Sequence, residues 1–153
     1  YRGPVSPISP RQWPRIKLDI TTDEIIVTDP CFLNIIHPYS DQISLNHYVV
    51  TVYSKYDLFS EKMRALFERS RPRDLYDVVE MSRQFNALDL HLFKECFMKK
   101  CAFKKIESLE ITQSKLEACE AGWNDQLSHQ LRDLPAFEEY LKEFRGFHER
   151  LAL

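Results

Sequence analysis

Three charged side chains fall on or beside the apolar faces of two expected helices, where they could act on phosphate groups. Between residues 57 and 69, Lys62 lies inside the apolar arc of a helical pattern. In the next pattern, 72–85, Asp74 lies at the edge of the apolar stripe, and Asp77 faces the same side one turn later. Phosphoryl transfer needs cations for the phosphates and carboxylates for a metal or a proton. We expect Asp74, rather than Asp77, to point inward.

Both placements also have purely structural interpretations, which the pattern leaves open. Lys62 could pack its aliphatic stem and extend its amine to water. Asp74 could be a first-turn acid that the helix dipole stabilises, or could pair with Arg71 or Arg73.

A strand pattern adds a second polar face. Residues 15–20 (RIKLDI) alternate strictly, so that Lys17 and Asp19 point away from the apolar side. With the two helices, this face could complete a phosphoryl-transfer centre, although charged pairs on solvated strand faces are common.

The pattern along the chain predicts an α+β fold. Further strands are expected at 24–27, 32–36 and 48–53, where turn-forming residues separate short β-type runs. The period then changes to about 3.6. Helices are expected at 55–69, 72–85, 88–106, 111–131 with a break near Gly122, and 135–152. We therefore predict a small, mostly antiparallel sheet in 1–54 and a helical bundle in 55–153.

Composition excludes several functional classes. The 153 residues carry a formal net charge of −2, so a polyanion site requires a local basic patch such as the one between Lys62 and Arg73. The four cysteines form no CxxC pair and the five histidines show no ligand spacing, which argues against a structural zinc site. No apolar run is long enough to span a membrane. We expect a cytoplasmic protein with reduced thiols.

Several motifs together resemble one family. They are the KLD of residues 17–19, LFSEKMRAL at 58–66, and RPRDLYD at 71–77. The C-terminal stretch also looks similar, with Trp123, Leu127, Gln130-Leu131 and the 134–140 segment. From about residue 13 to 145, the chain resembles the nucleotidyltransferase toxins of bacterial abortive-infection systems, of the AbiEii and AbiGii type.

The resemblance implies a reaction and assigns roles. Family members would transfer a nucleoside monophosphate from an NTP to RNA, plausibly the 3′ end of tRNA, with Mg²⁺. It implies that Lys62 with Arg69 contacts the nucleotide phosphates, and that an aspartate of the RDxxD block acts as base, a role that we expect Asp74 to take. That block is Arg73, Asp74 and Asp77 here. The KLD block supplies Lys17 to the phosphates and Asp19 to the metal or acceptor hydroxyl.

One part of the family pattern is missing. The family opens with a Gly-Ser turn and a DxD that holds magnesium, but this sequence has no acid-any-acid triplet and no glycine before a serine. We therefore expect the C-terminal portion of such a transferase, which alone binds no Mg²⁺ and is inactive.

Two alternatives stay open. The chain could be a non-catalytic helical module that binds an antitoxin, a partner subunit or RNA. A mildly basic face would serve that role, although a solvated helix surface explains it equally well. Its members are the lysines at 94, 99, 100, 104, 105 and 115. If another polypeptide supplies the missing block, the chain should expose a sheet edge and could dimerise through it.

Overall fold

The computed structural model describes residues 18, 20–35, 48–84 and 89–152. Within these ranges, a two-stranded antiparallel sheet precedes six helices, which confirms the predicted α+β class. The elements are β1 (Cys31–Asn34), β2 (Val49–Val52), α1 (Lys55–Arg69), α2 (Pro72–Gln84), α3 (Leu90–Phe103), α4 (Gln113–Ala121), α5 (Trp123–Leu127) and α6 (Phe137–Leu151).

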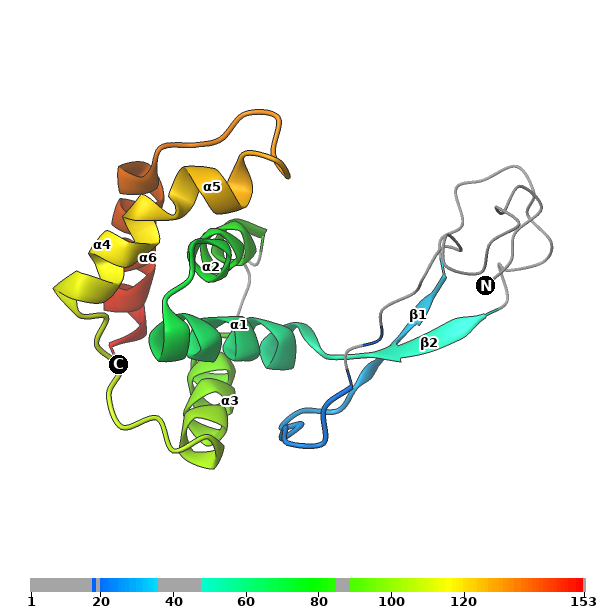
Figure 1. Ribbon diagram of the computed structural model, residues 1–153. Coiled ribbons are helices and arrows are strands. Elements are labelled where there is room, and N and C mark those ends of the chain that lie inside the picture. Colours follow the sequence, from blue (N-terminus) through cyan, green and yellow to red (C-terminus); the bar gives the residue numbers. More distant parts are fainter. Residues whose placement is uncertain (1–17, 19, 36–47, 85–88, 153) are drawn as a thin grey trace, which may run out of the picture.

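The two strands form a hairpin that projects away from the helices (Figure 1). Its register pairs Cys31 with Val52, and the strand predictions at 32–36 and 48–53 are thereby confirmed within a residue or two. Neighbouring strand residues point to opposite faces. Phe32 is 70% exposed and Leu33 56%, so both faces of the hairpin present apolar side chains to solvent.

The strand predicted at 24–27 is wrong. Residues 24–27 form no strand and pair with no described strand. Their polar backbone groups are satisfied by helix side chains instead. The N–H groups of Val27 and Thr28 donate to the Asp57 carboxylate at 3.0 and 2.8 Å, and the Ile25 carbonyl accepts from Lys100 at 2.7 Å.

The strand predicted at 15–20 falls mostly outside the described residues, and Lys17 and Asp19 are among those that the structure does not describe. Leu18 and Ile20 are described. Neither belongs to a strand and both side chains are exposed.

Helix α1 has the bounds that the sequence predicts. The Ser54 hydroxyl accepts from the Asp57 N–H at the N-terminus, and Ser70 ends the helix in a left-handed conformation with φ 47°. Arg64 of α1 is buried, although it is charged. Its guanidinium pairs with Glu61 at 2.6 Å and Glu68 at 2.8 Å, which compensates the lost hydration.

The apolar core lies among the helices. Phe59 of α1 contacts the ring of Phe93 from α3 at 4.7 Å between centroids, and that of Phe147 from α6 at 5.3 Å. Each fully buried aromatic or aliphatic side chain contributes roughly 1.5–3 kcal/mol. This core therefore fixes α1, the helix that carries Lys62.

A buried ion pair joins α3 to α1. The Lys100 ammonium lies 2.9 Å from Asp57, and both side chains are almost completely inaccessible to solvent. Burial acts to raise the pKa of Asp57, but hydrogen bonds from Thr28, Val27 and Lys100 outweigh it and lower the pKa from 3.8 to about 2. The pair thereby holds the 25–28 segment against the helices.

Gly122 separates α4 from α5, as the sequence predicts. A Cβ at this position would lie 3.4 Å from Pro72 Cγ and 3.0 Å from Gln126 Nε2. The glycine therefore permits a close approach to the start of α2. Nearby, the Trp123 indole N–H donates to the Pro135 carbonyl at 2.8 Å. Together these contacts place α5 beside α2.

All four cysteines are free thiols, and burial raises the pKa of Cys101 and of Cys119 to about 11. Among the described helices, none has the length and apolarity that a membrane crossing requires. The boundary predicted at residues 54 and 55 stays a prediction.

Candidate functional site

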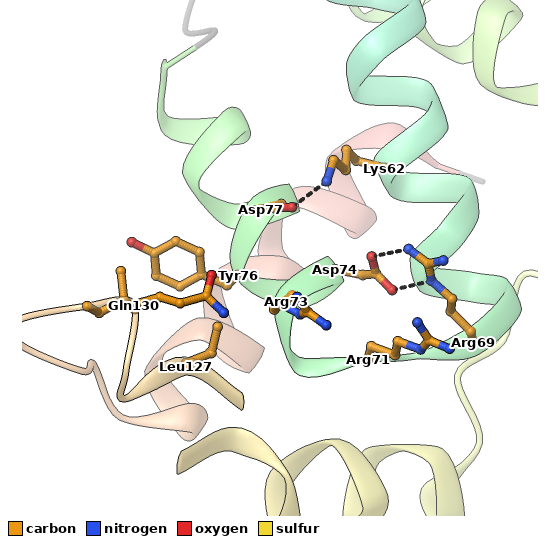
Figure 2. A pocket seen from close by; sticks show the side chains of 10 residues that line it. Lys62, Arg69, Arg71, Arg73, Asp74, Tyr76, Asp77, Leu127 and Gln130 are labelled. Atoms are coloured by element: carbon orange, nitrogen blue, oxygen red, sulfur yellow. Dashed lines mark hydrogen bonds and ion pairs between the residues drawn. The ribbon is translucent and has the colours of Figure 1, made fainter. Parts of the chain in front are cut away.

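One cavity, of about 410 Å³, collects the charged residues that the sequence singles out on the two expected helices (Figure 2). Helices α1 and α2 and the turn between them provide one side, and α5 with the turn after it provides the other. Its lining comprises Lys62, Arg69, Arg71, Arg73, Asp74, Tyr76, Asp77, Leu127, Gln130 and Leu131. The size suits a small ligand.

Lys62 of α1 and Asp77 of α2 form an ion pair at the cavity. The Lys62 ammonium donates to Asp77 Oδ2 at 2.6 Å, and the two side chains are 38% and 36% exposed. The amine thus reaches solvent, as the structural interpretation of Lys62 expects, but it does so inside a lined cavity. An incoming anion can compete with Asp77 for this cation.

Asp74 is bound by Arg69 through two hydrogen bonds. Arg69 Nε and Nη2 donate to the two carboxylate oxygens at 2.7 and 2.8 Å, and the Asp74 side chain is only 4% exposed. The expected inward position of Asp74 is confirmed. The alternative pairing with Arg71 or Arg73 is not observed, because the turn at Ser70 directs Arg69 back onto α2 and Arg69 is the partner. Its hydrogen bonds to Asp74 raise the pKa of Arg69.

Arg71 and Arg73 supply the net positive charge of the cavity. Both are exposed, and neither forms an ion pair or a hydrogen bond with another described side chain. The other two cations of the cavity, Lys62 and Arg69, are each paired with a carboxylate. Arg71 and Arg73 are therefore the guanidinium groups that can bind a phosphate without first breaking a contact.

Sequence patterns assigned no role to the uncharged residues that line the cavity. Tyr76 lies within the RDxxD block, between Asp74 and Asp77, and its ring stacks on Tyr140 with centroids 5.2 Å apart. Leu127 and Gln130 come from the C-terminal stretch that resembles the family, which was the available signal. Their convergence with α2 depends on tertiary packing.

The described residues of the cavity do not fit a resident magnesium ion. Both oxygens of Asp74 accept from Arg69, and Asp77 accepts from Lys62. In the part of the chain that the structure describes, no three carboxylate, histidine or cysteine side chains gather as a metal site. Asp19, the expected metal ligand, lies outside the described residues, so its role stays a prediction.

The mildly basic face expected from the later lysines is not a continuous surface. Lys100 is buried against Asp57, which removes it from the face. Lys94 donates to the Ala152 carbonyl at the end of α6, and Lys115 donates to the Phe67 carbonyl near the end of α1. These ammonium groups therefore satisfy helix C-termini.

Comparison with known families agrees with the motifs. The family model of the nucleotidyl transferase AbiEii toxin of type IV toxin–antitoxin systems matches residues 5–144, which include every residue of the cavity. No curated protein and no solved structure matches the chain. The match covers most of the 153 residues, and the chain belongs to the AbiEii nucleotidyltransferase toxin family.

Proposed function

We propose that the cavity is the phosphate-binding part of a centre that transfers a nucleoside monophosphate from an NTP to RNA, with tRNA as the expected acceptor. One observation supports this most strongly. Lys62 and Asp77, from two different helices, meet in the same cavity as Arg69, Asp74 and two further arginines. Family membership supplies the reaction type.

In this proposal, the residues divide the work of phosphoryl transfer. Lys62, Arg71 and Arg73 neutralise the triphosphate, and Lys17 assists from outside the described residues. The RNA hydroxyl oxygen forms a bond to the α-phosphorus while the bond to pyrophosphate breaks. Asp77 takes the hydroxyl proton, because one of its oxygens is not engaged by Lys62.

Asp74 and Arg69 then have a positioning role. Because both Asp74 oxygens are hydrogen-bonded to Arg69, removing a proton with Asp74 would require breaking that pair. We therefore favour Asp77 over Asp74 as the base. The expected roles of Asp19 and of Mg²⁺ remain part of the proposal. We expect no transfer by this chain until another segment supplies the DxD carboxylates.

Titration calorimetry with inorganic tripolyphosphate tests the phosphate site without requiring catalysis. We expect Lys62→Ala and Arg73→Ala each to weaken binding about tenfold, the effect of losing one charge-assisted hydrogen bond. Lys142→Ala, an exposed lysine of α6 away from the cavity, is the matched control and should bind normally. Equal affinities of the unaltered chain and the three variants for tripolyphosphate would refute the phosphate site.

A second candidate function is the binding of a protein partner through the hairpin. The apolar exposure of Phe32 and Leu33 on opposite faces favours it, and an antitoxin or partner subunit is expected for this family. A dimer through the sheet edge is the simplest form. Light scattering should then give twice the chain mass, and Phe32→Lys should return it to one chain. A single-chain mass for the unaltered protein contradicts the dimer. We expect these interactions in the bacterial cytoplasm.

A further inference from the structure

We propose that the uncharged wall of this cavity receives the base of the incoming nucleotide, and that the Gln130 side chain distinguishes one base from another. The wall consists of Tyr76, Leu127, Gln130 and Leu131. This inference rests on the proposed phosphate site, since the base can lie here only if the phosphates lie beside it.

The cavity is divided by chemistry. Figure 2 shows Tyr76, Leu127 and Gln130 on one side, whereas Lys62 and Arg69 lie on the other. A nucleotide has the same division, with an anionic phosphate end and a neutral, planar base. Apolar and aromatic side chains with a few polar groups are typical of sites that hold such a base.

The uncharged wall is fixed before any ligand binds. The Tyr76 ring lies nearly parallel to Tyr140, at an interplanar angle of 7°. Leu127 is buried in the core, and its carbonyl accepts from the N–H groups of Gln130 at 2.9 Å and Leu131 at 3.1 Å. This tight turn after α5 holds the backbone of both residues at the cavity.

The Gln130 amide presents an acceptor. Its Nε2 donates to the Gln126 carbonyl at 3.0 Å and lies 3.2 Å from His129 Nε2, which orients the group. No described residue donates to the remaining oxygen, Oε1. An acceptor here fits the exocyclic amino group of adenine or cytosine, whereas guanine and uracil present a carbonyl at the equivalent position. The wall should thus favour ATP and CTP over GTP and UTP.

Calorimetric titration of the whole chain with the four NTPs and with tripolyphosphate tests this inference. We expect the dissociation constants of ATP and CTP to be at least about fivefold lower than those of GTP and UTP. Gln130→Ala should abolish that preference and leave the tripolyphosphate dissociation constant unchanged within about twofold. Gln130→Glu, which keeps an acceptor, should retain the preference.

Gln113→Ala is the matched control, because Gln113 is another exposed glutamine with a local hydrogen bond, to Glu117 on α4. It should bind every ligand as the unaltered chain does. If tripolyphosphate binds but the four NTPs are not distinguished, or if Gln130→Ala weakens all ligands equally, the base-binding wall is refuted and the phosphate site stands. If neither tripolyphosphate nor any NTP binds, both proposals fail.

Discussion

Arg69 and Asp74 are five residues apart, on different helices, and join through two hydrogen bonds of 2.7 and 2.8 Å. The turn between them contains Ser70, whose backbone and hydroxyl both donate to the Leu66 carbonyl. This pair sets the angle at which α2 leaves α1. It therefore sets the position of Asp77 relative to Lys62.

Arg69→Ala should destabilise the fold. The change leaves the buried Asp74 carboxylate without its partner, and we expect the free energy of unfolding to fall by about 2 kcal/mol, less than for a fully buried pair because Arg69 is nearly half exposed. Urea denaturation at pH 7 measures it. Lys99→Ala removes an exposed pair with Glu95 and should leave stability unchanged. Equal losses in the two variants would show that the Arg69 pair has no special role.

Asp77→Asn should strengthen the binding of tripolyphosphate. The carboxylate now competes with an incoming anion for Lys62, and the neutral amide removes that competition and one negative charge. We expect the dissociation constant to fall several-fold, by calorimetry. In a reconstituted transfer assay the same variant should lose activity, because its amide cannot take the hydroxyl proton. Weaker tripolyphosphate binding would contradict the competition between Asp77 and phosphate.

Asp57 should make the fold sensitive to strong acid. The folded-state pKa of Asp57 is about 2, below the ordinary 3.8. Its contribution to the free energy of unfolding is therefore complete above about pH 4 and is lost as the pH falls toward 2. The contribution is on the order of 2 kcal/mol. In thermal unfolding, Asp57→Asn should be less stable at pH 7, and its melting temperature should fall less between pH 4 and 2 than that of the unaltered chain. A variant curve parallel to that of the unaltered chain would refute this assignment.

His148 should add a second pH dependence at a higher pH. Burial lowers its pKa below 6.5, since the ring packs against Phe67 and Phe144 in a partly apolar cavity. The unfolded chain binds the proton more readily, so stability falls as the pH drops through 6.5 and levels off below the folded-state pKa. Nearby Glu149 opposes the shift only partly. His148→Phe should show less loss of melting temperature between pH 7.5 and 5.5; an identical loss in both proteins would contradict the account.

The helices could be predicted because their signals are local. For α1, Ser54 caps the N-terminus and apolar residues recur at helical spacing as far as Phe67, so its predicted bounds agree with the observed ones. The hairpin strands were also recognisable from short β-type runs. By contrast, the 24–27 strand failed because the partner of that segment is a side chain, Asp57, about 30 residues away.

The convergence of the charged helix residues was predictable, but their pairing was not. Helical spacing favoured Lys62, Asp74 and Asp77 for one place, and all three line the same cavity. The partner of Asp74 was missed because a left-handed residue at Ser70 redirects Arg69, and non-glycine residues seldom adopt that conformation. Gln130 was missed because its approach to α2 depends on how α5 packs, a contact without a local sequence signal.

The most direct test of the nucleotide cavity is amide NMR of the chain titrated with CTP and with tripolyphosphate. The account predicts that both ligands cause saturable shifts at Lys62 and at residues 69–77. Only CTP should also shift residues 127–131. Shifts confined to the lysines of α3, or no saturable binding by either ligand, would contradict it.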